Sequence, residues 1–125
     1  MSSVNLEHYD KWKENKLFIK DLITMLDNVL EHFIEYVVDT SLLGEYNVNY
    51  KRFKKYVRKE RKGYAKAAFS AYRERSIGLG AMGFHSYLQT KNLPFAGLLQ
   101  TSINREIFRH IKSESNKASE ALATD

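Results

Sequence analysis

The fold of this chain depends on a glycine-rich stretch, Ser76-Ile77-Gly78-Leu79-Gly80-Ala81-Met82-Gly83. Three glycines within six residues disfavour a regular helix. The apolar residues between the glycines suit a short buried strand, so we expect one strand over Ile77–Ala81. Its glycines would let the strand pass close to other backbone.

The same glycines also fit G-x-G-x-x-G, the pattern of dinucleotide sites in which a pyrophosphate lies at a helix N-terminus. Such a site needs a hydrophobic strand directly before the glycines and an acidic residue about 20 positions later, ending a second strand. Here residues 72–76 are polar, and the next acid is Glu106, inside a predicted helix. We therefore favour close backbone packing over a nucleotide site.

The chain on either side of this stretch has mainly helical patterns. Apolar residues recur at helical spacing from about Lys16 to about Val38, behind Asn15 as an N-cap. A connection follows over 39–49, and Asn92-Leu93-Pro94 is a predicted helix stop. Further helices are expected over 50–62, 65–75, 84–89 and from Ala96 or Gly97 to about Leu122, after which the tail should fray. The predicted fold is mostly α-helical with one short strand.

Positive charge is concentrated in one block. Residues 51–75 contain eleven Lys and Arg against two acids, a net +9, whereas the rest of the chain has nine against thirteen, a net −4. Cations interleaved with aromatic rings suit phosphate binding and base stacking, and the rings here are Tyr50, Phe53, Tyr56 and Tyr64. The alternative is a solvated helix face, and no known nucleic-acid-binding motif accompanies the block. We expect at most weak nucleic-acid contact through Lys51–Arg75.

No residue is predicted to be catalytic, cofactor-binding or metal-binding. Cysteine is absent, which excludes disulfides, thiolate metal sites and a cysteine nucleophile from this chain. No two of the four histidines lie three or four positions apart, so no helix face presents two imidazoles: His8, His32, His85 and His110. The adjacent His85 and Ser86 are expected to cap or pack, because a catalytic dyad needs converging side chains.

The carboxylates of the long helix are expected on its solvated face rather than in acid–base chemistry: Asp21, Asp27, Glu31, Glu35 and Asp39. No apolar run approaches the roughly 20 residues that a membrane span needs. The start of the chain has neither the basic nor the apolar region of a signal peptide. We therefore expect a cytoplasmic protein without membrane contact.

Three stretches resemble a known family in the same order. The run Arg73-Glu74-Arg75-Ser76-Ile77-Gly78-Leu79-Gly80-Ala81-Met82-Gly83-Phe84-His85-Ser86-Tyr87-Leu88-Gln89 closely resembles a segment of the large, catalytic subunit of aerobic class I ribonucleoside-diphosphate reductase. Ser2-Ser3-Val4-Asn5-Leu6-Glu7-His8-Tyr9-Asp10-Lys11-Trp12 is similar to the stretch after one of the family's redox-active cysteines. Leu26-Asp27-Asn28-Val29-Leu30-Glu31-His32-Phe33-Ile34 is similar to the helix that follows. The stretch Asn92-Leu93-Pro94-Phe95 and the last predicted helix also resemble the family.

The resemblance implies a segment of the ten-stranded α/β barrel that encloses the radical site, with a scaffolding role in making deoxyribonucleotides for DNA replication. The family's catalytic cysteines and carboxylate precede the part that Ser2 matches, and its substrate-phosphate loop follows the part that Leu122 matches. No catalytic or nucleotide-binding residue carries over, and the chain alone should be inactive. The implied partners are the other pieces of the large subunit and, through them, the radical-generating small subunit.

Residues 42–62 fit the family less well and are interpreted as a basic extension. Met1 stands just beyond the position of a family cysteine, which suggests an interrupted gene or a fragment boundary. Two alternatives remain: a small basic helical nucleic-acid-binding protein and a nucleotide-binding domain built on the glycines. The reductase hypothesis is favoured, because the basic block explains none of the three matching stretches.

Overall fold

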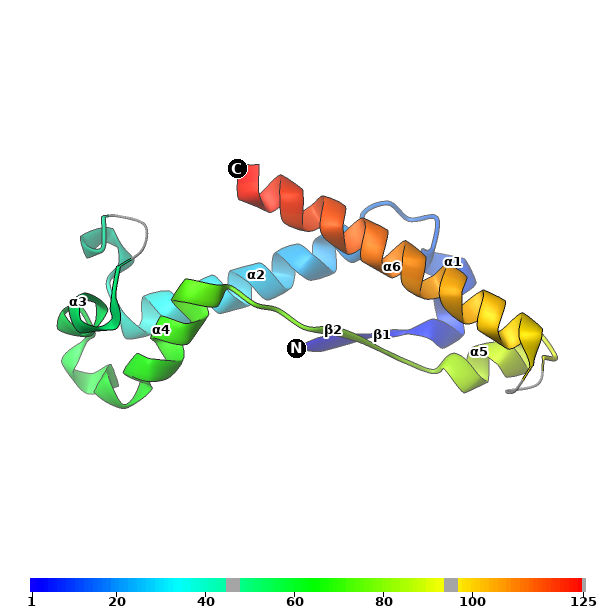
Figure 1. The fold of residues 1–125 in the computed structure, drawn as a ribbon, viewed down its shortest axis with the longest axis horizontal. Coiled ribbons are helices and arrows are strands. Elements are labelled where there is room, and N and C mark those ends of the chain that lie inside the picture. Colours follow the sequence, from blue (N-terminus) through cyan, green and yellow to red (C-terminus); the bar gives the residue numbers. More distant parts are fainter. Residues whose placement is uncertain (45–47, 94–96, 125) are drawn as a thin grey trace. The chain divides into compact units, whose positions relative to one another are not determined.

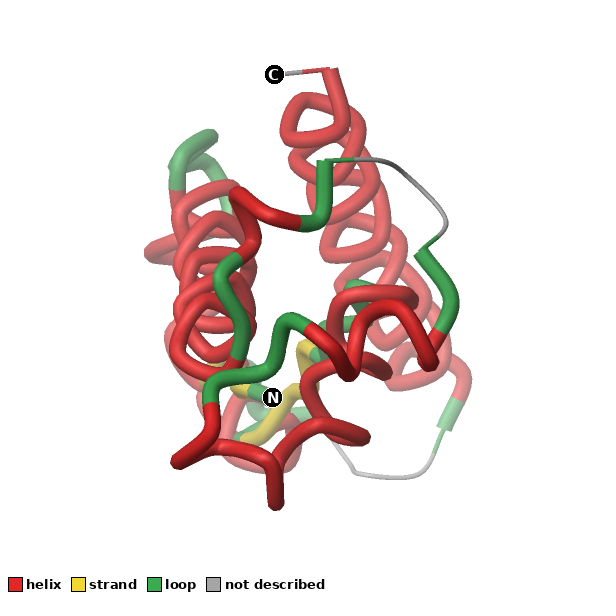
Figure 2. Tube along the Cα trace, turned by 90° about the vertical axis from the view of Figure 1, so that its left-hand side faces the viewer, coloured by secondary structure: helices red, strands yellow, loops and turns green. Residues whose placement is uncertain are grey.

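The computed structural model describes residues 1–44, 48–93 and 97–124. The chain divides into two compact units, which are described separately. The first unit combines residues 1–25 with residues 78–125, and the second consists of residues 26–77. Figures 1 and 2 show that, within the described residues, helices predominate and strands are short. The expectation of a mostly helical fold is therefore confirmed.

The first unit contains a parallel pair of strands. Strand β1, Ser2–Asn5, pairs with β2, Leu79–Met82, in a register that sets Val4 opposite Ala81 (Figure 1). The strand expected over Ile77–Ala81 exists but lies slightly later in the chain. Strand β1 was not predicted, because only one of its four residues, Val4, is apolar. That side chain is 1% exposed and belongs to the core of this unit.

Short helices follow each strand of the first unit. A 3-10 turn, η1, covers Leu6–His8, and α1 covers Tyr9–Trp12. Helix α5, Phe84–Thr90, confirms the helix expected over 84–89. Together with the start of α2, Phe18–Val37, and with α6, Leu98–Thr124, they enclose one apolar core. Its buried members are Val4, Leu6, Tyr9, Trp12, Ile19, Ile23, Tyr87, Ile107, Ile111 and Ala118.

Two long helices match their predicted patterns. Helix α2 covers Phe18–Val37, against a prediction of about 16–38, and the Asn15 side chain accepts a hydrogen bond from the Leu17 amide (3.0 Å). Helix α6 covers Leu98–Thr124 and so extends past the predicted fraying point at Leu122. The predicted stop at Pro94 and the alternative helix start at Ala96 lie outside the described residues. No described helix is long and apolar enough to cross a membrane.

The second unit corrects one expectation. Instead of one basic helix over 50–62, the chain forms α3, Tyr50–Lys55, and then a separate 3-10 helix, η3, Lys59–Tyr64. Between them Val57 pairs with Val38 in an isolated antiparallel bridge, and the Arg58 amide donates to the Val37 carbonyl (3.0 Å). This non-local pairing takes the backbone out of helical geometry after α3.

The rest of the second unit packs around α3 and the end of α2. A 3-10 turn, η2, covers Thr40–Leu42, and α4, Ala65–Glu74, confirms the helix expected over 65–75. The connection expected over 39–49 contains η2, and its residues 45–47 lie outside the described residues. The buried core of this unit consists of Ile34, Val37, Val38, Leu43, Val48, Phe53, Val57, Ala65 and Ala68.

Candidate functional site

The glycine-rich stretch packs against the start of the chain. Gly83 has φ +79°, in the left-handed region that favours glycine, and a Cβ placed on it would overlap Oδ1 of Asn5 and come within 3.2 Å of the Glu7 nitrogen. A Cβ on Gly80 would meet the Ser3 hydroxyl at 3.4 Å. The space beside Gly83 is thus filled by Asn5 and Glu7 of the chain itself. The geometry agrees with close backbone packing.

Three side chains from different elements meet the Asp10 carboxylate. The Tyr87 hydroxyl donates to Oδ1 of Asp10 at 3.0 Å, Lys91 Nζ lies 2.5 Å from Oδ2, and Lys13 Nζ lies 3.3 Å from Oδ1. The hydrogen bond from Lys91 is the main cause that lowers the pKa of Asp10 below its usual value. Burial, followed by the bond to Asp10, raises the pKa of Tyr87 to about 12. This network joins α1 to α5 and its end.

Sequence reasoning missed the Asp10 network, because Asp10 and Tyr87 are 77 positions apart and no short motif joins them. The network is not arranged for proton transfer near neutral pH, since Tyr87 holds its proton and Asp10 stays ionised.

Beside the Asp10 network, the ring of Tyr9 packs edge-on against Trp12, Tyr87 and His110, with centroid distances of 5.0, 5.8 and 5.9 Å. The cluster is therefore a structural contact of the first unit.

Two of the long-helix carboxylates converge on one arginine. Arg75 donates from Nη1 to Glu31 Oε2 (2.6 Å) and from Nη2 to Asp27 Oδ1 (2.8 Å). The hydrogen bond to Glu31 is the main cause that raises the pKa of the Arg75 guanidinium. Arg75 caps the C-terminal end of α4 with φ 45°, an uncommon conformation for a residue with a side chain. Because the guanidinium neutralises both carboxylates, they are poorly suited to acid–base work.

The remaining sequence candidates do not assemble into a site. Asp39 is half-buried and accepts hydrogen bonds from the amide and hydroxyl of Ser41, so it caps η2. His8, His32 and His85 are exposed, and His110 lies half-buried among aromatic rings. Among the described residues, no group of three or more histidines and carboxylates is placed to hold a metal ion.

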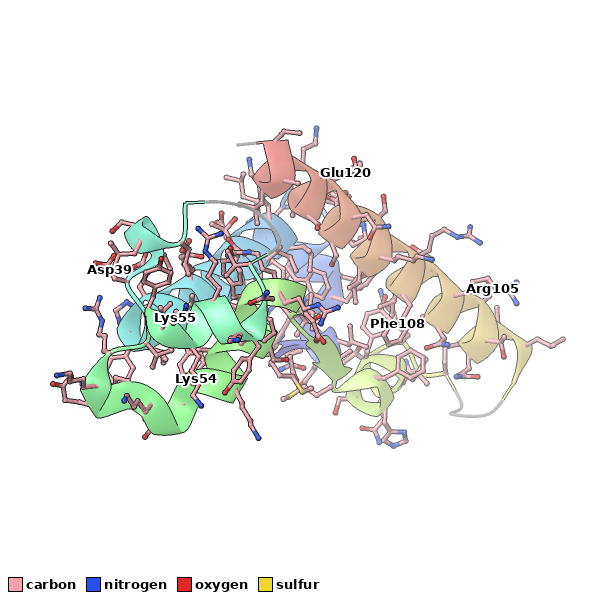
Figure 3. The ribbon with its side chains drawn as sticks, turned by 60° about the vertical axis from the view of Figure 1, so that its left-hand side comes forward. Asp39, Lys54, Lys55, Arg105, Phe108 and Glu120 are labelled. Carbon is pink, nitrogen blue, oxygen red and sulfur yellow. The ribbon has the colours of Figure 1, made fainter. Side chains whose placement is uncertain are left out.

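The basic block forms an exposed surface on the second unit. Six lysines of α3, η3 and the start of α4 are exposed: Lys51, Lys54, Lys55, Lys59, Lys62 and Lys66. We call these lysines the basic surface; Lys54 and Lys55 project from α3 in Figure 3. Of the aromatic residues in the block, Phe53 is fully buried, and the ring centroid of Tyr50 lies 5.3 Å from that of Phe69. Tyr64 remains 52% exposed.

Comparison with known proteins identifies the family. The sequence profile described as ribonucleotide reductase, barrel domain, matches residues 1–125, the whole chain. This chain belongs to the ribonucleotide reductase barrel-domain family. The resemblance found in the sequence is thereby confirmed.

Relatives of this barrel-domain chain are much longer proteins. The ribonucleoside-diphosphate reductase large subunit of Invertebrate iridescent virus 6 is 40% identical over 114 residues, covering 91% of this chain and 10% of the relative. The putative large subunit of Frog virus 3 (isolate Goorha) is 38% identical over 125 residues, covering 100% of this chain and 18% of the relative. The class Id ribonucleotide reductase alpha subunit of Actinobacillus ureae is similar in structure, with a TM-score of 0.74 and 30% identity over 98% of this chain and 19% of that one.

The barrel-domain chain thus spans 10–19% of the length of these three proteins. Within that segment, the most specific of the three sequence matches, residues 73–89, contains β2 and the glycines in and beside it. The interpretation of residues 42–62, which carry most of the basic surface, as an extension stays a prediction.

Proposed function

We propose that this chain supplies part of the wall of the ribonucleoside-diphosphate reductase barrel and does not reduce ribonucleotides by itself. The observation that carries the proposal is the parallel pair of β1 and β2. Parallel sheets occur mostly as larger sheets with covered faces. Within the described residues each strand has one partner, so each has an outer edge at which a further barrel strand would pair.

Exposed apolar side chains of the first unit support the same proposal. Leu98 and Leu99 at the start of α6 are 92% and 63% exposed, and Met82 in β2 is 57% exposed. Exposed apolar surface of this kind marks interfaces when it is contiguous with further apolar area. In the proposed barrel, neighbouring strands and helices of the large subunit would cover these side chains.

The chemistry would come from the rest of the enzyme. A chain without cysteine can form neither a thiyl radical nor a reducing dithiol. The proposed partners are the other segments of the large subunit and, through them, the radical-generating small subunit, in the cytoplasm. A small nucleic-acid-binding protein is not favoured as the identity of this chain, because the family match extends over its whole length.

We further propose that residues 42–62 are an extension of the barrel segment rather than part of its wall. Leu43, Val48, Phe53 and Val57 from this stretch are buried in the core of the second unit, so the extension is folded into that unit. It carries most of the basic surface.

A chimaeric large subunit tests the proposal. Residues 1–125 would replace the matching segment of the Frog virus 3 large subunit, and ribonucleotide reduction would be assayed with the small subunit and a dithiol reductant. We expect the chimaera to retain activity and the isolated chain to have none. A matched chimaera carrying Gly83→Val should be inactive, because the added side chain would overlap Asn5. Turnover by the isolated chain, or an inactive chimaera that is folded and bound to the small subunit, would refute the proposal.

A further inference from the structure

The lysines of the basic surface have no carboxylate partner among the residues that the structure describes. None of its six lysines forms an ion pair with any residue in the described part of the chain, whereas Arg75, in the same block, is neutralised by Asp27 and Glu31. Lys51, Lys54 and Lys55 have the i, i+3 and i+4 spacing that places them on one face of α3. Like charges held this close repel one another, and binding an anionic chain would relieve that repulsion.

Two half-exposed aromatic rings lie at η3, the 3-10 helix that carries Lys59 and Lys62. Tyr36 in α2 and Tyr64 at the end of η3 are 47% and 52% exposed, and their ring centroids lie 6.5 Å apart. The guanidinium carbon of Arg61 lies 4.1 Å from the Tyr36 centroid, and Arg61 forms no ion pair with a described residue. Tyr36 comes from outside the basic block, so the sequence alone did not associate it with the lysines.

We propose that the basic surface, together with Tyr36 and Tyr64, binds single-stranded nucleic acid without sequence preference. Lysines neutralise phosphates, and solvent-accessible aromatic rings next to them stack unpaired bases. A duplex keeps its bases stacked on one another, so its phosphates would contact the lysines while its bases would not stack on the tyrosine rings. An acidic protein segment or an anionic membrane would likewise engage the lysines and give the rings no specific role. The inference is independent of the reductase proposal.

The first test compares ligands on the intact chain by fluorescence anisotropy. The probes are oligothymidylate and oligouridylate of about 16 nucleotides, the upper end of the site sizes known for single-strand-binding folds, and a duplex of matched length. We expect both single strands to bind more tightly than the duplex. Binding should weaken on the order of 100-fold between about 50 and about 200 mM NaCl. Oligouridylate binding without oligothymidylate binding would restrict the ligand to RNA and overturn binding that tolerates either sugar.

The second test separates the rings from the charges. Tyr36→Leu and Tyr64→Leu keep the net charge and most of the apolar volume. Each should weaken single-strand binding about 10-fold, the size of one lost base stack, and leave duplex binding unchanged. Lys54→Glu with Lys55→Glu should abolish both. The matched control, Lys16→Glu with Lys20→Glu, makes the same charge change at exposed positions of the first unit and should retain binding.

Circular dichroism would verify that each variant is folded. If a tyrosine variant does not fold, crosslinking of wild type to an iodouracil-substituted oligonucleotide replaces it, with crosslinks expected at Tyr36 or Tyr64. Several outcomes would overturn the inference: duplex binding as tight as single-strand binding, unchanged affinity of both folded tyrosine variants, or crosslinks confined to other residues. Binding to phosphatidylglycerol vesicles without oligonucleotide binding would do the same and would identify a membrane-binding surface.

Discussion

The hydroxyl of Tyr87 donates a hydrogen bond of 3.0 Å to the carboxylate of Asp10 and so fastens α5 to α1. Tyr87 is buried, whereas Asp10 is exposed and also contacts two lysines. Removal of the hydroxyl leaves Asp10 with other partners. We therefore expect Tyr87→Phe to lower the free energy of unfolding by about 1 kcal/mol, measured, as for the other variants below, by urea titration of the chain in complex with the flanking segments of a reductase large subunit. Tyr64→Phe, at an exposed ring, is the control and should have little effect.

The same hydrogen bond predicts a dependence on alkaline pH. Tyr87 has a pKa raised to about 12 in the folded chain, above its usual value of 10.0. A group whose pKa is raised by folding holds its proton more tightly in the native state, so its contribution is complete below about pH 10 and is lost as pH rises towards 12. Wild type should therefore lose more stability over this window than Tyr87→Phe. Parallel stability curves for the two chains would show that Tyr87 does not titrate in this way.

Among the glycines, we expect substitution of Gly83 to lower folding stability most. Its φ of +79° and the overlap of an added Cβ with Asn5 mean that Gly83→Ala must distort the contact between the start of α5 and the start of η1. We expect a loss of about 3 kcal/mol in the free energy of unfolding. Gly63→Ala is the matched control, because a Cβ there meets nothing within 4 Å. It should change stability by less than about 1 kcal/mol; equal effects of the two substitutions would contradict the packing described for Gly83.

Arg75 combines an ion-pair network with an uncommon backbone conformation. Arg75→Ala removes the contacts to Glu31 and Asp27 and should cost about 1 kcal/mol, a difference that shrinks in high salt. Arg75→Gly also removes them but suits φ 45°, so it should be about 1 kcal/mol more stable than Arg75→Ala. The control is Arg73→Ala, at an exposed neighbour. If the alanine variant equals or exceeds the glycine variant in stability, the left-handed conformation of residue 75 is not a source of strain.

Local patterns predicted the helices, whereas contacts between distant residues decided the rest. The long apolar repeats placed α2 and α6 within a few residues of their observed bounds. Strand β1 escaped prediction because four residues with one apolar side chain have no periodicity, and its pairing with β2 depends on residues 77 positions away. The predicted basic helix over 50–62 ends early because Val57 pairs with Val38, a contact between residues distant in the sequence.

For the candidate sites too, some features could be predicted from the sequence and others depended on tertiary packing. Absence of cysteine and the scattered histidines could be read directly from the sequence and argued against chemistry within this chain. The charge of the basic block was equally plain. The sequence did not show which aromatic rings of the second unit stay exposed. Burial of Phe53 and the approach of Tyr36 to Tyr64 follow from the packing of that unit.

The central claim, that this chain is a wall segment which needs the rest of the barrel, is tested most directly by thermal unfolding with and without the flanking segments of a reductase large subunit. Alone, the chain should self-associate through its exposed apolar residues and strand edges and unfold without a sharp transition. Flanking segments should yield a defined complex with a higher, cooperative unfolding temperature, because partners that bind only the folded chain stabilise it. A monodisperse monomer with a sharp transition that the flanking segments leave unchanged would contradict the account.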